Sequence, residues 1–306
     1  MQTMTAKRME RYYEIYKQIW ENPLISKSEI GENIGLTRKT VARYLDEMDS
    51  TVIHGPAISL KPARNYQEYA YFLEVDNPRS AFEDLKEFPS VHSVTMAFGD
   101  WSLSFISEER INVEELKGFK KCILQEIKSA TTTSKVTTLD WDESMKTMHS
   151  MHPPQKKSSL KEKAFIIPWQ DWEWALYREF RHNVRASVTD VLEKLGIPQS
   201  WYTRWSSSLS HFGNVQVTFY PLKVKKYVTH DFLFKSDYQK PLVDTLGLLP
   251  STSVFFSVGD YLLARISVSN KTETLDLYNF VMALKEKGFC TDFSRAIVVE
   301  SKEWIP

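Results

Sequence analysis

The clearest candidate binding residues are a run of threonine and basic side chains that follows Gly35. Val41, Leu45 and Met48 recur at helical spacing, and we expect them to face a core. The opposite, exposed face then carries the hydrogen-bonding side chains Thr37, Arg38, Lys39, Thr40 and Arg43. Arginine and lysine suit phosphate oxygens or guanine edges, and threonine suits either. Their position at the start of a helix favours nucleic-acid contact, with a solvated charged face as the alternative.

A second candidate helix carries one cation among aromatic residues. Gln199, Thr203 and Arg204 present groups that can reach bases or phosphates in the same way. Three neighbouring aromatic residues, Trp201, Tyr202 and Trp205, could instead pack against another domain, and we favour this equally with DNA contact. A later set of lysines suits phosphate contact or is a solvated run: Lys223, Lys225 and Lys226.

Both candidates belong to a pattern that occurs twice along the chain. Leu24–Ile30 followed by Gly35 returns as Arg185–Val191 followed by Gly196. A glycine-aspartate segment returns in the same order, as Phe98–Leu103 and Val258–Leu263. The distance of roughly 160 positions is typical of duplicated domains, since solenoid repeats are about 20–50 residues long. We therefore expect two copies of one unit.

Each copy begins with a predicted helical unit. In the first copy, apolar spacing and capping residues predict helices over residues 9–20, 26–35 and 37–48. Two short strands around Gly55-Pro56, over residues 51–54 and 57–60, would form a β-hairpin. In the second copy, Ser187-x-x-Asp190, Gly196 and Pro198 occupy equivalent places, and Val215, Val217 and Phe219 alternate as a wing strand. The pattern predicts two winged helix-turn-helix domains.

An α/β unit follows each helical unit. The first is expected to have strands over residues 70–75, 91–97, 101–106 and 136–139, with helices over 76–88 and 113–127. The second is expected to have strands over 232–234, 253–258, 261–268 and 296–300, with helices over 239–246 and 272–287. The order βαββαβ is ferredoxin-like.

The predicted fold class is therefore α+β, with two winged helix-turn-helix domains and two ferredoxin-like domains in tandem. The expected boundaries are 1–62 and 66–141 for the first pair and 166–226 and 228–306 for the second, with a linker over 142–165. The linker is polar and carries Pro153-Pro154.

The composition restricts the function further. The 39 basic and 39 acidic residues cancel, so nucleic acid must be bound by local patches. Two distant cysteines favour a reducing cytoplasm, and no apolar run or leader points to a membrane or to secretion. Several soft or imidazole ligands lie close together in the linker, which would suit a soft metal ion. We favour incidental composition as the explanation for this set: Met145, Met148, His149, Met151 and His152. No catalytic triad, metal-ligand spacing or phosphate-binding glycine loop is found in the sequence.

The chain resembles the Lrp/AsnC family of prokaryotic transcription regulators. The resemblance lies in Ser26–Ile30, Gly35–Val41 and the hairpins Phe98–Trp101 and Val258–Tyr261. It implies dimerisation through the α/β domains, which the family's RAM domains mediate, and often an amino-acid effector near that interface. Asp49–Ile53 departs from the family pattern, because the usual glycine is missing there, and the third helix of the second copy is also far from it.

By this resemblance, the candidate effector-binding residues lie at the two glycine-aspartate turns: Gly99, Asp100, Trp101, Gly259, Asp260 and Tyr261. Turn geometry alone is the alternative explanation for both glycines.

We therefore expect a cytoplasmic, sequence-specific transcription regulator that binds double-stranded DNA as a covalent pseudo-dimer of Lrp-like units. It would self-associate through its α/β domains, take a small-molecule effector such as an amino acid, need no cofactor or metal, and not be an enzyme. Two alternatives stay open. One is a siroheme-type tetrapyrrole decarboxylase, whose fold is similar, and the other is a regulatory scaffold without DNA binding.

Overall fold

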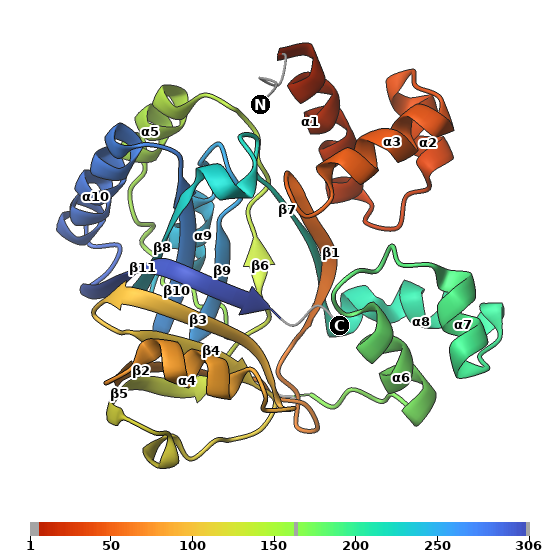
Figure 1. The fold of residues 1–306 in the computed structure, drawn as a ribbon. Coiled ribbons are helices and arrows are strands. Elements are labelled where there is room, and N and C mark those ends of the chain that lie inside the picture. The colour runs from red at the N-terminus through yellow and green to blue at the C-terminus, as the bar shows by residue number, and fades with distance from the viewer. Residues whose placement is uncertain (1–5, 162–164, 304–306) are drawn as a thin grey trace.

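The structure is a computed structural model in which residues 6–161 and 165–303 are described. It is a mixed α/β protein with antiparallel sheets, and Figure 1 shows two helical units on one side of an α/β part. The first helical unit consists of α1 (Ala6–Glu21), α2 (Lys27–Ile34) and α3 (Arg38–Met48). The second consists of α6 (Asp171–Phe180), α7 (Val188–Leu195) and α8 (Gln199–Phe212). In the described chain, no helix is long and apolar enough to cross a membrane.

Local capping determines where the short helices begin and end. The Ser26 hydroxyl accepts a hydrogen bond from the Glu29 amide while the Glu29 carboxylate accepts one from the Ser26 amide, which is a capping box. Thr37 caps α3 by accepting from the Thr40 amide. Gly35 and Gly196 end α2 and α7 with φ of 68° and 65°, where side chains are disfavoured. These predicted helices are confirmed.

The two helical units share a β-ribbon. Strand β1 (Ile53–Leu60) pairs antiparallel with β7 (Gly213–Phe219), with Ile53 opposite Phe219 and Leu60 opposite Gly213. The hairpin predicted within residues 51–60 is therefore wrong. Gly55-Pro56 lies at a register shift inside one strand, and β7 supplies hydrogen-bond partners on both sides of that shift.

The ribbon carries side chains into both helical cores. At one end, Ile53, Val217 and Phe219 join the core of the first helical unit, where the Phe219 ring stacks on Tyr16 with centroids 4.6 Å apart. At the other end, Ile58 and Leu60 join the core of the second helical unit. Each helical unit is thus completed by a strand from the other half of the chain.

The α/β part is a nine-stranded antiparallel sheet in the order β5-β2-β4-β3-β11-β8-β10-β9-β6. The strands of its first half are β2 (Tyr69–Val75), β3 (Val91–Gly99), β4 (Leu103–Ser107) and β5 (Phe119–Ile127). The strands of its second half are β8 (Val228–Lys235), β9 (Val254–Val258), β10 (Tyr261–Val268) and β11 (Asp292–Glu303). β11 pairs with both β8 and β3, so it joins the halves, and the short β6 (Thr132–Thr133) pairs with β9.

Helices cover the outer faces of this sheet, α4 (Pro78–Leu85) on the first half and α9 (Gln239–Leu246) and α10 (Lys271–Glu286) on the second. The second half has the predicted βαββαβ order. In the first half, the helix predicted over residues 113–127 is wrong, because only Val113–Glu115 form a short 3-10 helix and β5 follows. The segment becomes a strand because it pairs with the edge of β2, a tertiary contact that outweighs its helical spacing.

Two further expectations are corrected between the halves. The strand predicted over residues 136–139 is absent from the described chain, and Val136 instead lies in the first helical core, its amide donating to the Tyr16 hydroxyl. The expected linker over residues 142–165 contains most of α5 (Trp141–Ser150). Met145 and Met148 of α5 are buried against the second α/β half, so part of that segment belongs to the core.

The inner faces of the two sheet halves meet in a shared apolar core that includes Phe72, Trp101, Phe256 and Leu263. Gly99 lies where β3 and β11 join. A Cβ atom built there would be 2.4 Å from the Arg295 carbonyl oxygen, and φ is +155°, so this close approach requires glycine.

We expect Gly99→Ala to lower the free energy of unfolding by about 2–3 kcal/mol, because the methyl group would force β3 from β11. Gly288→Ala is the control. Its φ is 82° but nothing lies within 4 Å of the added atom, so only the backbone strain, about 1 kcal/mol, is expected. Urea unfolding of both variants measures the difference, and equal losses would contradict the close approach.

Candidate nucleic-acid interface and a buried charge cluster

Helix α3 presents the predicted binding side chains to solvent. Val41 and Met48 are fully buried in the first helical core, whereas Arg38, Lys39 and Arg43 are exposed on the opposite face. The threonines at the N-terminus of the helix are engaged with each other, with the Thr37 and Thr40 hydroxyls 2.9 Å apart. The α3 face therefore combines three exposed cations with the amide-rich start of a helix, a combination that attracts phosphate.

An acidic side chain on α3, Glu47, has partners of its own. Glu47 forms an ion pair with Arg8 of α1, with 2.6 Å between Arg8 Nη2 and Glu47 Oε2, and it accepts from the Tyr12 hydroxyl at 2.9 Å. Arg43 lies 3.9 Å from Glu47 and its side chain is 63% exposed. Because Arg8 neutralises Glu47 first, Arg43 keeps its charge available for an external anion.

Helix α8 places the second set of candidates differently. Gln199, Thr203 and Arg204 are exposed, but the Arg204 guanidinium lies over the Trp172 ring, 5.2 Å from its centroid. The Trp172 and Trp201 rings are themselves 4.8 Å apart, and Trp205 is buried in the second helical core. Most of these aromatic residues thus pack within their own helical unit, and DNA contact by α8 stays a prediction.

The three lysines of the second half lie next to the first helical unit. They follow strand β7, which ends beside the first helical unit. There the Tyr220 amide donates to the Val52 carbonyl and the Val224 amide donates to the Thr51 carbonyl, just after α3. Their segment includes the short 3-10 helix Val224–Lys226. Sequence order had associated these lysines with the wing of α8.

The two glycine-aspartate turns have different surroundings. The Asp100 carboxylate accepts from the Arg295 amide at 2.8 Å, and Trp101 is 1% exposed in the core between the sheet halves. Asp260, by contrast, is exposed and pairs with Lys161 at 2.8 Å. Gly99 and Asp100 therefore have a structural role at the β3–β11 junction, and effector binding at these turns and at Tyr261 stays a prediction.

Three residues of the suggested soft-metal set have packing roles. Met145 and Met148 are buried in the second α/β core, and His149 packs edge-on against Phe280. Within the described residues, no group of three or more histidine, cysteine, aspartate or glutamate side chains could hold a metal ion.

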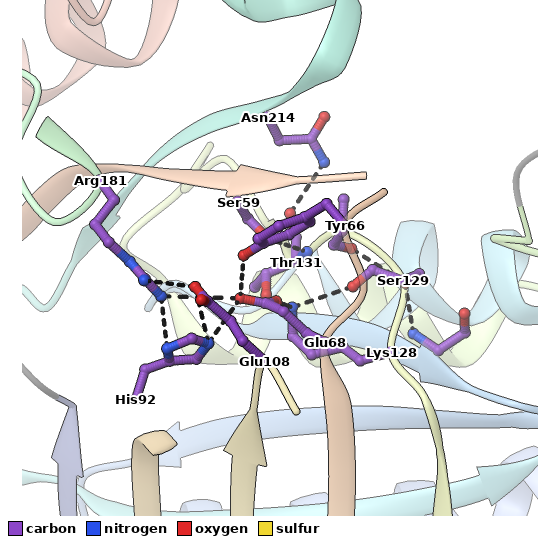
Figure 2. Close-up of polar contacts among 12 residues, drawn as sticks. Ser59, Tyr66, Glu68, His92, Glu108, Lys128, Ser129, Thr131, Arg181 and Asn214 are labelled. Atoms are coloured by element: carbon purple, nitrogen blue, oxygen red, sulfur yellow. Dashed lines mark hydrogen bonds and ion pairs between the residues drawn. The ribbon is translucent and has the colours of Figure 1, made fainter. Parts of the chain in front are cut away.

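A buried charge cluster joins the second helical unit to the first α/β half (Figure 2). Lys128 and Glu68 form an ion pair, with 2.7 Å between Nζ and Oε2, and their side chains are 3% and 10% exposed. Arg181, at the end of α6, donates to Glu108 and to His92 Nδ1, each at 2.8 Å. His92 Nε2 lies 3.3 Å from Glu68 Oε1, so the histidine bridges the two ion pairs.

The geometry of the cluster determines its protonation. A guanidinium only donates, so His92 Nδ1 must accept and the ring is neutral. The pKa of His92 is lowered to about 4, mainly by burial. The nearby Arg181 charge also lowers it, and this effect is larger than the opposite effect of the Glu68 carboxylate. Burial would raise the pKa of Glu68, but the Lys128 ammonium and, less strongly, the Arg181 guanidinium bring it down to about 2.

These shifts predict an acid-sensitive fold. The pKa of His92 is lower in the folded state than in the unfolded chain, so its contribution is complete above about pH 6.5 and is lost as the pH falls toward 4. Between pH 7 and pH 5, above the range in which folded Glu68 titrates, we expect protonation of His92 to lower the free energy of unfolding by about 2 kcal/mol. His92→Gln should reduce the pH dependence by about this amount, because His182, whose pKa is also lowered to about 4, keeps its own contribution, while His211→Gln, at an exposed site on α8, should not reduce it. Urea midpoints at both pH values provide the measurement, and parallel curves for wild type and His92→Gln would refute it.

The charge cluster leaves no motif in the sequence. Its members come from five separate segments, around residues 68, 92, 108, 128 and 181, and each is an ordinary polar residue in its own sequence context. The signals that could have indicated it are His92 and Lys128, which lie at the ends of apolar strands.

The comparisons with known proteins can now be set against this geometry. Residues 13–50 match the model of winged helix-turn-helix DNA-binding domains. The first helical unit is a winged helix-turn-helix domain. The matched residues include α2 and α3, and α3 carries the exposed cations described above. No curated protein matches the sequence.

Three solved structures are similar in fold. The siroheme decarboxylase NirDL is 13% identical and aligns over 97% of this chain and 94% of its own, with a TM-score of 0.45. Its complex with an iron-uroporphyrin III analogue is 15% identical over 95% of this chain and 92% of its own, with a TM-score of 0.45. AsnC of E. coli is 10% identical over 39% of this chain and 89% of its own, with a TM-score of 0.28.

One expectation from the sequence is overturned by these alignments. The prediction that the chain is not an enzyme is contradicted, because structures of a decarboxylase align with nearly its whole length. The absence of a familiar catalytic motif was insufficient ground for that prediction. Residues from distant segments can surround a large ligand without leaving any motif in the sequence.

Proposed function

We propose that this protein is a sequence-specific DNA-binding transcription regulator in which α3 of the winged helix-turn-helix domain enters the major groove. The observation that carries the proposal is the exposed cationic face of α3 in a domain of a DNA-binding family. Arg38, Lys39 and Arg43 would contact phosphates or guanine edges, and Thr37 and Thr40 would orient the start of the helix. The paired Glu47 would keep repulsion of the phosphates small.

The regulator would act as a covalent pseudo-dimer of two Lrp-like units. The β1–β7 and β3–β11 pairings support this, because both join the two halves of a single chain. The second unit would read a different half-site through Gln199, Thr203 and Arg204 of α8. A fused pair can present two different reading helices, whereas a homodimer must present two identical ones. Self-association and a small-molecule effector at the α/β part belong to the same proposal.

The first experiment measures DNA binding and its salt dependence. Genome-wide mapping of the tagged protein supplies bound fragments, and fluorescence anisotropy then gives affinities on those fragments at several salt concentrations. We expect the logarithm of affinity to fall with the logarithm of salt, with a slope of about −0.9 for each phosphate neutralised. Absence of enriched sites, together with affinity independent of salt, would contradict the proposal.

A second measurement tests the alternative of a tetrapyrrole ligand. The purified protein is titrated with iron uroporphyrin III, and the absorbance near the Soret band is recorded with and without the bound DNA fragment. An unchanged porphyrin spectrum together with salt-dependent DNA binding is the result expected for the regulator. A shifted, saturable Soret band without DNA binding would favour the decarboxylase.

A further inference from the structure

The two helical units touch through one arginine that lies outside the binding face. Arg185, in the loop between α6 and α7, donates through Nη1 to the Ile25 carbonyl at 2.7 Å and to the Pro23 carbonyl at 3.1 Å. Both acceptors lie in the loop between α1 and α2, immediately before the Ser26 cap. Arg185 therefore bonds directly to the backbone that begins the helix-turn-helix of the other half.

This contact is built for position rather than for charge pairing. Within the described chain, no carboxylate lies within ion-pair distance of Arg185. Both of its acceptors across the contact are backbone carbonyls, whose geometry is set by the loop. Its own loop is held as well, because the Arg185 amide donates to the Asn183 side chain and the Val184 amide donates to Pro56 of β1. Burial lowers the pKa of Arg185, which agrees with a side chain largely removed from water.

The sequence repeat explains why only one half carries this residue. In the repeated segment, Arg185 occupies the position that Leu24 occupies in the first copy. If the two copies were identical, an isologous contact would bring two guanidinium groups toward each other at the same place. The covalent pair avoids this, since one copy has the donor and the other has the acceptor loop.

We infer that Arg185 is a positioning residue that fixes the distance and orientation between α3 and α8, so that the protein prefers two half-sites at one spacing. The inference rests on the DNA-binding function proposed above. The β1–β7 ribbon joins the same two units, and each unit also contacts the rest of the chain, the first through Val136 and the second through the charge cluster. Arg185 adds a direct attachment between the loops of the two units, which restrains the relative rotation that these indirect connections leave.

The first arm of the test needs no DNA. Spin labels are placed at Glu32 of α2 and Glu193 of α7, both exposed, in full-length protein carrying Cys122→Ser. Electron-electron resonance should give one narrow distance peak, and Arg185→Leu should broaden it at least about twofold. Arg178→Leu, an exposed arginine on α6, is the matched control and should leave the peak unchanged. Arg185→Gln is measured beside it, so that a folding defect in one variant does not decide the result. A distribution that neither Arg185 variant broadens would overturn the inference.

The second arm measures spacing preference on DNA. Duplexes carry two half-sites whose separation varies in single base pairs over about one helical turn. We expect wild-type affinity to vary at least about tenfold across the series and that of Arg185→Leu by less than about threefold, with equal affinities for an isolated half-site. A wild-type protein without spacing preference would overturn the inference. If the wild type bound no DNA, the proposed function would fail, and the distance measurement would still decide whether Arg185 holds the two units together.

Discussion

Replacing Arg38 and Arg43 together by alanine is expected to weaken binding to an operator fragment at least about tenfold, and about a hundredfold if both reach base edges. Each arginine contributes a phosphate or guanine contact of about 1–3 kcal/mol, and both are exposed, so little folding energy depends on them. Arg43 has a long contact to Glu47, which Arg8 continues to neutralise in the variant, and a contact with the Tyr44 ring, whose centroid is 5.1 Å away. Anisotropy titration at fixed salt measures the loss, and the salt slope should decrease by about two.

The matched control removes two charges elsewhere. Lys117→Ala with Lys271→Ala changes the net charge by the same amount at exposed positions of the α/β part. We expect affinity within about twofold of wild type, because charges farther than a Debye length of about 8–10 Å from the DNA are screened. Circular dichroism should show unchanged helix content in both double variants. Equal affinities for the two double variants would reject α3 as the reading helix.

Lys128→Met is expected to lower the free energy of unfolding by about 3–5 kcal/mol. The substitution removes the closest cation from the buried Glu68 carboxylate and leaves the Arg181 guanidinium 4.0 Å from Glu68 Oε1, while His92, which is neutral, cannot replace the lost charge. The Lys128 ammonium also donates to the Ser129 carbonyl and lies 5.2 Å from the Phe256 ring centroid, contacts that methionine replaces only in part. Because the cluster joins the second helical unit to the first α/β half, we expect that junction to open first. Urea unfolding, followed by tryptophan fluorescence and by circular dichroism, measures both effects.

The double variant Glu68→Gln with Lys128→Met separates the cost of an unpaired charge from the value of the pair. With no ion left unpartnered, we expect it to recover about half of the loss or more. As a control, Lys157→Met removes the lysine of an exposed ion pair with Asp237 and should change stability by less than about 1 kcal/mol. If the double variant were as unstable as Lys128→Met alone, the loss would come from packing and not from the buried charge.

Local signals in the sequence were sufficient for most helices and for the exposed face of α3. Ser26 with Glu29, Thr37, and the glycines at positions 35 and 196 act on amides and carbonyls within four residues, so their effect depends little on the rest of the fold. The exposed side of α3 followed in the same way, because buried Val41 and Met48 determine which residues face outward. The cations of the winged helix-turn-helix could therefore be named before the structure was known.

Long-range pairing was beyond those signals. Residues 119–127 satisfy helical spacing, and they form β5 only because β2 offers an unpaired edge. Gly55-Pro56 is typical of a turn, yet it lies within β1 because β7, more than a hundred residues later, continues the ladder. The polar segment that begins with Asp142 forms most of α5 because Met145 and Met148 find an apolar surface on the second α/β half.

The sequence by itself therefore determined the helix ends and the side chains that α3 presents, since these depend on neighbours along the chain. Only the tertiary structure decided that the two helical units exchange strands, that Arg185 joins their loops, and that Glu68, Lys128, His92 and Arg181 are buried together. Those contacts join segments that are far apart in the sequence. Bringing such segments together costs chain entropy, and this cost is compensated by burial and strand pairing across the whole fold. No short window of sequence contains that balance.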